Sequence, residues 1–341
     1  MPKINNNAQI QSRILKGWKP NLYLTNIGIA FFQTLPFVAR ELFPIVPVQL
    51  QSSFYYKFDK GDLARRQMKD KPQFGKVSPA QMGQTDDSYA TKVKQIITGI
   101  DQIATLNYQR SGAAGVADPR RARTQFVTEQ MNIELDCNFA DKFFKADVWN
   151  NQYAGVASNP SASQFLRFSD AASDPIKVID ELLTDGKRRA RRKFNKLGLG
   201  ADVFNALKNH PDILARVSYG GSTANPATVN ENVLAQLFGL QRVVVLESTY
   251  NKAGDGETED MDFICDPKGM LLCFVPDAPS IDVPSAGYTF AWDMLGDGNW
   301  MAVDQFEGEG GTHSEYIEGL ISTDMKKVSD DCAVYLKDAV A

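Results

Sequence analysis

Apolar residues recur at helical spacing in two stretches of the chain. Asp118 followed by Pro119 is a typical helix start, because aspartate caps the helix and proline fits its first position. We therefore predict one long helix over 118–145. The residues expected to form its buried stripe are Phe126, Ile133, Cys137, Ala140 and Phe144.

A second helix begins by the same rule at Asp174 and Pro175. Its apolar residues also follow the helical period, which places them on one face. The residues of this stripe are Ile179, Leu182, Gly186, Ala190 and Phe194. Between the two helices, a stretch rich in Asn, Ser and Gly predicts a loop.

Apolar and polar residues alternate in parts of 48–100, which is the pattern of a strand rather than of a helix. The alternating residues are Val48, Leu50, Phe54, Tyr56 and Phe58. A charged centre marked by Gly and Pro follows, so we predict a long two-stranded excursion. Because an isolated ribbon is only marginally stable, we expect it to rest on a neighbouring chain.

Residues 1–47 show no sustained helical period and are rich in Asn, Gln and Pro. A free tail with so many bulky apolar residues would promote aggregation. We therefore predict an extended arm that docks on other subunits. The aromatic residues expected to be buried by this docking are Trp18, Phe31, Phe32, Phe37 and Phe43.

Three motifs follow one another between residues 197 and 292. The first is a helical segment that contains Leu207, His210, Pro211, Ile213 and Arg216. The second contains Leu234, Ala235, Leu237, Phe238, Gly239, Val243, Val245 and Tyr250, and the third is the run from Pro284 to Trp292. In order and spacing, these motifs resemble the axial domain of the major capsid proteins of tailed double-stranded-DNA bacteriophages. Those proteins have the Hong-Kong-97-type fold, and the similarity is to the lambda-like major capsid branch.

The resemblance implies an α+β fold with a peripheral and an axial lobe. A length of 341 residues agrees with two lobes, because it exceeds the usual size of one compact domain. The implied parts are an N-terminal arm over 1–47, an extended loop over 48–100, a peripheral domain over 101–198 with spine helix 118–145, an axial domain over 199–283, and a peripheral domain return over 284–341.

The resemblance also implies a structural protein rather than an enzyme. Such proteins self-assemble into the hexamers and pentamers of an icosahedral shell that encloses double-stranded DNA. The alternative is an encapsulin-like nanocompartment shell, which has the same fold and holds enzymes instead. The expected location is the virion capsid, assembled in the host cytoplasm. The expected partners are other copies of the chain, packaged double-stranded DNA bound non-specifically, the portal, a separate scaffolding protein and an optional decoration protein.

The net charge of −4 conceals an uneven distribution along the chain. Residues 254–341 contain 19 acidic and 4 basic residues, whereas residues 1–253 contain 33 basic and 22 acidic residues. The first acidic residue is Glu41. This asymmetry favours assembly or the binding of a polyanion, since opposite charges steer association.

Three charged clusters are candidate contact sites. Basic residues on the second helix could bind phosphates or an acidic subunit face, and they are Arg188, Arg189, Arg191 and Arg192. Arg120, Arg121 and Arg123 lie in the first turns of the long helix, where the helix dipole disfavours positive charge. We expect a carboxylate of another subunit to compensate them. The acidic loop lacks the ligand spacing of an EF-hand, and the resemblance places it at the capsomer centre; its residues are Asp255, Glu257, Glu259 and Asp260.

Nothing in the sequence predicts a catalytic residue, a metal ligand or a cofactor. The histidines are His210, which belongs to the first motif, and His313, which lies beside Ser314 without a G-x-S-x-G elbow. The four cysteines lack CxxC spacing, so we interpret them as reduced core thiols. Charged residues and prolines interrupt the longest apolar stretch, so no membrane span is predicted. The arm starts at Met1, and no N-terminal segment is therefore expected to be removed.

Overall fold

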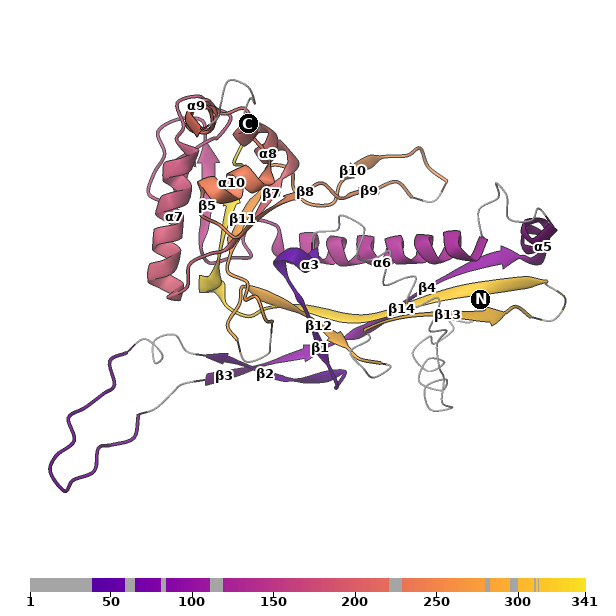
Figure 1. Cartoon of the computed structure of the whole chain (residues 1–341), viewed down its shortest axis with the longest axis horizontal. Helices are drawn as coiled ribbons and strands as arrows, with labels where there is room; N and C mark the ends of the chain where they lie inside the picture. Colours follow the sequence, from indigo (N-terminus) through magenta and orange to yellow (C-terminus); the bar gives the residue numbers. More distant parts are fainter. Residues whose placement is uncertain are drawn as a thin grey trace.

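The computed structural model describes residues 39–58, 65–80, 84–110, 119–220, 229–254, 256–279, 283–294, 300–309, 311 and 313–341. Figure 1 shows two lobes, each built on a β-sheet, and a long ribbon that projects away from both. The predicted arm residues Trp18, Phe31, Phe32 and Phe37 lie outside the described residues, as do Asp118 and Asp255.

The first lobe contains a long sheet with one helix laid along it. Its strands run in the order β1-β12-β14-β13, and β4 pairs with the other edge of β14. Their bounds are Ile45–Val48 for β1, Lys92–Asp101 for β4, Gly287–Trp292 for β12, Met301–Glu307 for β13 and Ser314–Lys327 for β14. The helices of this lobe are α3 (Ala39–Leu42), α5 (Gln102–Arg110) and α6 (Pro119–Phe143).

Helix α6 confirms the predicted long helix but buries a different face from the predicted one. Its apolar residues follow a regular four-residue period on the buried side: Val127, Met131, Leu135, Phe139 and Phe143. Of the predicted stripe, Phe126 is 42% exposed, Ile133, Cys137 and Ala140 are partly exposed, and Phe144 is buried.

The predicted buried stripe of α6 was wrong because polar residues share the face that is actually buried. Thr124, Thr128, Asn132 and Asp136 are all buried there. The hydroxyl of Thr128 donates to the carbonyl of Thr124, and that of Thr124 donates to the carbonyl of Arg120, both at 2.9 Å. A threonine that returns its hydrogen bond to the helix backbone can be buried without a separate partner.

The second lobe is a β-sheet with helices packed against it. Its strand order is β6-β5-β15-β11-β7-β8. The bounds are Gln152–Val156 for β5, Gln164–Leu166 for β6, Lys196–Gly200 for β7, Arg242–Leu246 for β8, Met270–Cys273 for β11 and Ala333–Lys337 for β15. The helices are α7 (Pro175–Ala190), α8 (Ala201–Lys208), α9 (Pro211–Gly220), α10 (Glu231–Leu237) and the short η1 (Asp330–Cys332), and a hairpin of β9 (Thr249–Asn251) and β10 (Met261–Phe263) projects from this lobe.

Helix α7 confirms the second predicted helix and its start. The Asp174 side chain accepts a hydrogen bond from the backbone N–H of Lys177 at 3.0 Å, as an N-cap residue does. In the predicted stripe, Ile179, Leu182, Gly186 and Phe194 are buried and Ala190 is partly buried.

Strand pairing corrects the predicted domain boundaries. β5 and β6 precede residue 199 and β7 begins before it, yet all three lie in the second sheet with the strands of the expected axial domain. β15, near the C-terminus, pairs with both β11 and β5. Residues 152–200 and 333–337 therefore belong with 201–273, and the second lobe is built from segments that are distant along the chain.

One apolar core joins the two lobes. It includes Val127 and Phe139 of α6, Ile317 of β14, and also Leu271 and Tyr335 of the second sheet. A separate core lies under α7, α8 and α10 on the other side of the second sheet. The C-terminal half of α6 is thus shared between the lobes, and its packing fixes how one lobe sits on the other.

The described end of the arm packs within its own chain, which corrects the prediction for this part. Phe43 is fully buried, with ring centroids 5.2 Å from Phe139, 4.7 Å from Phe143 and 6.4 Å from Trp149. β1 pairs in parallel with β12, from Ile45 opposite Thr289 onward. Residues 39–48 are therefore part of the first lobe.

The extended loop has the predicted two strands. β2 (Ser52–Phe58) and β3 (Gln84–Ala90) pair antiparallel. Phe54 is 72% exposed, which agrees with a ribbon face that only a neighbouring chain would cover. The other face packs within the chain, because Tyr55 is 1% exposed and both Tyr55 and Tyr89 pack against the Phe290 ring of β12.

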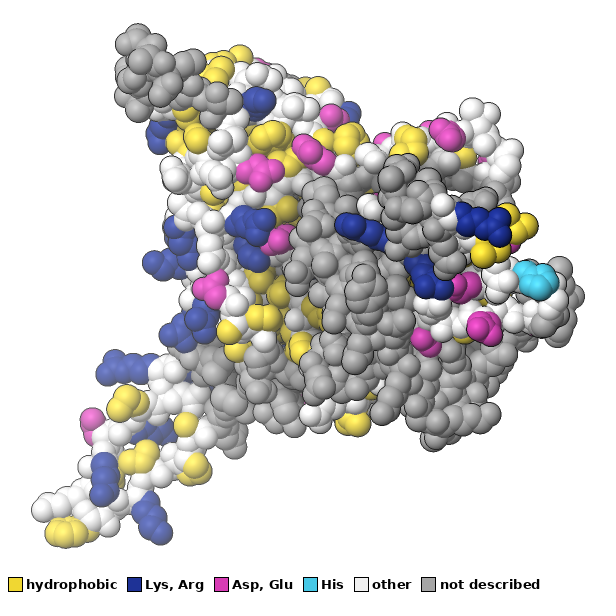
Figure 2. Space-filling model, turned by 45° about the vertical axis from the view of Figure 1, so that its right-hand side comes forward, with side chains coloured by type: hydrophobic (Ala, Val, Ile, Leu, Met, Phe, Trp, Pro, Cys, Tyr) yellow, Lys and Arg dark blue, Asp and Glu magenta, His cyan; other side chains and the backbone are white. Residues whose placement is uncertain are grey.

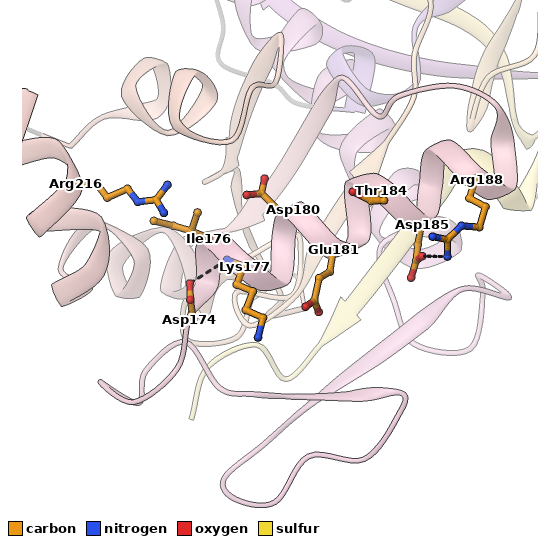
Figure 3. Close-up of a pocket in the computed structure, with 9 residues that line it drawn as sticks. All are labelled: Asp174, Ile176, Lys177, Asp180, Glu181, Thr184, Asp185, Arg188 and Arg216. Carbon is orange, nitrogen blue, oxygen red and sulfur yellow. Dashed lines mark hydrogen bonds and ion pairs between the residues drawn. The ribbon is translucent and has the colours of Figure 1, made fainter.

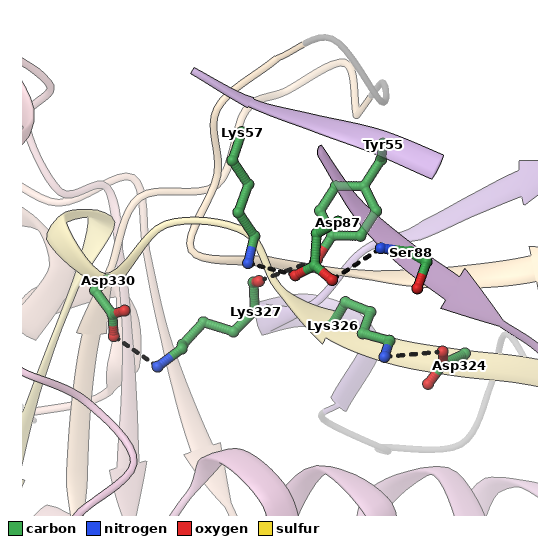
Figure 4. A network of polar contacts seen from close by, with 8 residues as sticks. All are labelled: Tyr55, Lys57, Asp87, Ser88, Asp324, Lys326, Lys327 and Asp330. Carbon is green, nitrogen blue, oxygen red and sulfur yellow. Dashed lines mark hydrogen bonds and ion pairs between the residues drawn. The ribbon is translucent and has the colours of Figure 1, made fainter. Parts of the chain in front are cut away.

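Polar contacts fix the base of this ribbon to the first sheet (Figure 4). The Tyr55 hydroxyl donates to Asp87 at 3.1 Å, and the same carboxylate accepts from the Lys57 ammonium at 2.5 Å. The backbone N–H of Ala90 donates to Asp324 of β14 at 3.0 Å. Burial first, and then the Asp87 carboxylate, raises the pKa of Tyr55, which keeps the phenol protonated as the donor.

Gly319 allows β14 to approach α6 closely, so we predict that Gly319→Ala destabilises the fold. A Cβ atom there would lie 2.0 Å from Met131 Cε and 2.2 Å from Val127 Cγ1. Overpacking of this kind costs about 1–3 kcal/mol. The matched control is Gly254→Ala, whose Cβ would lie 3.5 Å from Glu257. Urea unfolding of both variants checks this, and an equal loss of stability would contradict it.

The cysteines are free thiols, and three are buried as predicted while Cys137 is partly exposed. Burial, together with the carboxylates of Glu134, Asp141 and Asp136, raises the pKa of Cys137 to about 11. Only the thiolate reacts with iodoacetamide. At pH 8, we therefore expect Cys137 to be alkylated about a hundredfold more slowly than a free thiol, with the rate rising toward pH 11. Mass spectrometry measures the alkylation rate of Cys137 in the folded chain and in the urea-unfolded chain. Equally fast labelling of Cys137 in the folded chain would contradict its raised pKa.

Candidate self-assembly surfaces

His210 has a buried structural role. The backbone N–H of Asp212 donates to its Nδ1 at 3.3 Å, so the ring proton lies on Nε2, 3.1 Å from the Ser173 hydroxyl oxygen. That hydroxyl already donates its proton to the Asp170 carbonyl at 2.7 Å. The imidazole therefore cannot act as a base toward Ser173, and it instead ties the turn before α9 to the loop before α7.

The described part of the chain offers no metal centre and no membrane-spanning helix. No three His, Cys, Asp or Glu side chains among these residues are placed to hold an ion. No described helix combines the length and the apolarity needed to cross a bilayer. His313 is exposed in the turn before β14. The candidate contact surfaces of the described chain are its charged clusters and the exposed apolar tip of the extended loop.

The arginine cluster lies at the end of α7, and two of the four arginines predicted on this helix follow it instead. The helix ends at Ala190, and Arg191 follows in the left-handed conformation with φ of 55°. Arg188 is exposed and pairs with Asp185 at 3.0 Å. Arg189 is half-buried and donates to the Asn151 side chain, while Arg192 lies 5.8 Å from the centroid of the Phe274 ring.

The basic start of α6 is compensated within the chain, contrary to the prediction for Arg120. Its guanidinium makes two parallel hydrogen bonds of 2.9 Å to Glu315 of β14. The Glu315 residue is 8% exposed, so this bidentate pair is partly shielded from water. Arg121 and Arg123 remain exposed on the same turns. No pairing of residues between α6 and β14 could be inferred from the sequence, because 195 positions separate them.

The acidic loop joins β9 to β10 and projects beside α6 (Figure 1). Asn251 stabilises its base, because its side-chain oxygen accepts from the backbone N–H groups of Ala253 and Asp260 at 3.0 and 2.9 Å. Lys252 pairs with Asp262 across the hairpin. Glu257, Glu259 and Asp260 are exposed. Its placement at a capsomer centre stays a prediction.

The tip of the extended loop presents an aromatic side chain that the sequence interpretation missed. The Gly75 N–H donates to the Pro72 carbonyl at 3.1 Å, which closes a tight turn. Phe74 lies in this turn with φ of 62° and is 98% exposed. Met68 nearby is 94% exposed. Figure 2 shows hydrophobic and basic side chains together along this projection. The Pro-x-Phe-Gly order of residues 72–75 was the sequence signal that could have indicated this turn.

A shallow cavity of about 640 Å³ lies along the exposed face of α7 (Figure 3). Its lining includes Asp180 and Glu181 of the helix, Arg188 near its end and Arg216 of α9. Lys177 and Asp185 line it as well, and Arg216 lies near the start of α7, so carboxylates and cations are mixed along this face. Such a mixed polar surface suits contact with another protein surface better than an apolar ligand.

Comparison with known proteins gives the family context. No family model matches the chain. It is 24% identical over 261 residues to the "Major capsid protein" of Burkholderia phage BcepMu, covering 74% of this chain and 75% of the relative. A "phage-related protein" from Bordetella bronchiseptica RB50 superposes over 94% of this chain and 97% of its own, with a TM-score of 0.70 and 17% identity.

Two further structures share the arrangement. A virus-like particle from Pyrococcus furiosus matches 92% of this chain and 98% of its own, with a TM-score of 0.52 and 8% identity. A structure titled Microbacterium phage Oxtober96 matches 89% and 91%, with a TM-score of 0.51 and 10% identity. The chain has the Hong-Kong-97-type capsid fold. The resemblance to phage major capsid proteins inferred from residues 197–292 is thus confirmed.

We predict that Phe74→Ala weakens self-association without changing stability. An almost fully exposed ring contributes nothing to the isolated fold, whereas a rigid aromatic side chain at an interface is a typical hot spot. A loss of about 1.4 kcal/mol would lower association about tenfold. Sedimentation velocity measures assembly, and thermal unfolding measures stability. Gln73→Ala in the same turn serves as the control, and equal assembly of both variants would refute the role of Phe74.

Proposed function

We infer that this chain is the structural major capsid protein of a tailed double-stranded-DNA phage. The observation that carries the inference is a fold match over nearly the whole chain, joined to sequence similarity with a phage major capsid protein. The chain self-assembles into hexamers and pentamers of an icosahedral shell that encloses double-stranded DNA. Its mechanism is binding between identical copies, with no chemical step.

The shape of the subunit supports this function. The extended loop leaves the body as a two-stranded ribbon and exposes Phe74 and Met68 almost completely. Exposed apolar side chains of this size mark interaction surfaces. A second copy of the chain is the partner that every subunit of a shell has available, so such loops strap neighbours together.

Charge supports the packaging of DNA over the encapsulin-like alternative. Basic residues crowd the loop tip, which carries Arg65, Arg66, Lys69, Lys71 and Lys76. Exposed arginines also lie at the start of α6. Positive surfaces bind the DNA backbone without sequence preference. A compartment that holds enzymes has no general need for such surfaces.

The remaining partners follow from this function. The packaged double-stranded DNA is bound non-specifically. A portal provides its entry, and a separate scaffolding protein sets the curvature of the shell. A decoration protein is an optional addition to the outer surface. The protein works in the virion capsid and is assembled in the host cytoplasm, without membrane contact, cofactor or enzymatic activity.

Sedimentation and negative-stain microscopy of the purified chain test this function directly. We expect capsomers or closed shells, because only a neighbouring copy can bury the exposed apolar side chains at the tip of the loop. Particles isolated from the producing host should protect long double-stranded DNA from nuclease. Particles that hold an enzyme instead would favour the encapsulin-like alternative. A well-behaved monomer at micromolar concentration would contradict both forms of shell.

A further inference from the structure

Opposite edges of the second lobe carry opposite charge. On one edge, six of the seven residues 187–193 at the end of α7 are basic. On the other, the turn 254–262 between β9 and β10 contains five acidic residues and no basic one. Figure 1 places α7 on one side of the lobe and the hairpin on the other, where it projects past the body.

The basic edge is accessible and has a surplus of positive charge. The Arg188 side chain is 77% exposed, and Lys187, Arg191 and Arg192 are exposed as well. The Asp185 carboxylate offsets one of these charges through its pair with Arg188. Helix dipoles favour cations at a C-terminus. So many exposed cations on one edge also favour contact with an anionic surface.

The acidic edge is exposed, and hydrogen bonds hold its base. In addition to the contacts of Asn251, the Lys252 N–H donates to the Asp260 carbonyl at 2.8 Å, which closes the base of the hairpin. Glu259 and Asp260 are exposed, and the adjacent Met261 is 61% exposed. Because the base is already held, less conformational entropy is lost when the hairpin docks.

Symmetry makes the two edges natural partners. In a ring of identical chains, one edge of each copy meets the other edge of the next copy. Unlike charges on the two edges then attract at every contact around the ring. A contact between the basic edges of two copies, or between their acidic edges, would instead bring like charges together, which is unfavourable.

The order of charges along α7 also sets the orientation of the docked hairpin. On α7, the exposed acids Asp180 and Glu181 precede the basic last turn. On the hairpin, Lys252 is already paired with Asp262, and the exposed acids Glu259 and Asp260 lie toward the turn. A hairpin whose tip meets the end of α7 therefore places its acids beside the basic turn and away from the acids that precede it. The shallow cavity, which Arg188 lines at this end of α7, provides a concave seat for the tip (Figure 3).

We propose that the β9–β10 hairpin of one copy docks on the exposed face of α7 of the next copy in a capsomer. Glu259 and Asp260 of the hairpin then face Lys187 and Arg188 of the helix. The partner is therefore a second copy of this chain, and the inference rests on the proposed shell function. It assigns the arginine-rich end of α7 to a subunit contact rather than to DNA.

Charge reversal tests this contact with three variants of the full chain. The hairpin variant carries Glu259→Lys and Asp260→Lys, and the helix variant carries Lys187→Glu and Arg188→Glu. The combined variant carries all four substitutions and serves as the matched control. Circular dichroism and thermal unfolding establish that each remains folded, and sedimentation velocity measures the assembled fraction.

Each two-residue variant should assemble at least about tenfold less than the unmodified chain, since every contact then opposes like charges. The combined variant should recover assembly to within about twofold. Mixing the hairpin and helix variants should restore hexamers, because an alternating ring of six again pairs unlike charges at every contact, whereas a ring of five cannot alternate and keeps one unfavourable contact.

Two results would overturn the docking. One is normal assembly of the folded hairpin variant. The other is a helix variant that forms normal shells but packages less DNA, which would assign the arginines to DNA. Failure of the unmodified chain to assemble at all would instead reject the proposed shell function.

Discussion

The buried carboxylate of Asp136 holds together three parts of the chain on which the rest of the structure depends. One of its oxygens accepts the backbone N–H of Ala39 at 2.8 Å, and the other accepts the Ser248 hydroxyl at 2.7 Å. The first contact fixes the end of the arm, and the second fixes the segment that leads into the hairpin. A buried acceptor that lost these donors would carry its full desolvation cost, so the three parts are held as a unit.

The parts joined by Asp136 form a single body, which explains how the extended loop and the hairpin can project far and still be held in place. The core around α6 joins both sheets, so the lobes form one body from which the extended loop and the hairpin project. The projections are fixed at their bases, by Asp87 for the loop and by Asn251 for the hairpin. A shell needs such geometry, because contacts that are each weak add up only when their relative positions are preserved.

Some candidate surfaces could be predicted from the sequence and others could not, because their residues lie at very different distances along the chain. The arginines at the end of α7 and the acids of the hairpin could be found from local composition alone. The pairing of Arg120 with Glu315 could not, since the two meet only after β14 pairs within the first sheet. Phe74 was missed because an isolated phenylalanine in a charged segment has no period; the flanking Pro72 and Gly75 were the local sign of a turn, and its left-handed conformation is seen in the structure.

The sequence by itself determined the long helices, the two-stranded loop and the order of the capsid-like motifs, because caps and periodicity are local properties. Tertiary structure alone decided which face of α6 is buried, since Thr124 and Thr128 satisfy their own hydroxyls and so enter the core as if they were apolar. It also decided that β15 completes the second sheet, which no local pattern specifies. Burial depends on what lies opposite a residue, and β14, which lies against α6, follows it by more than a hundred positions.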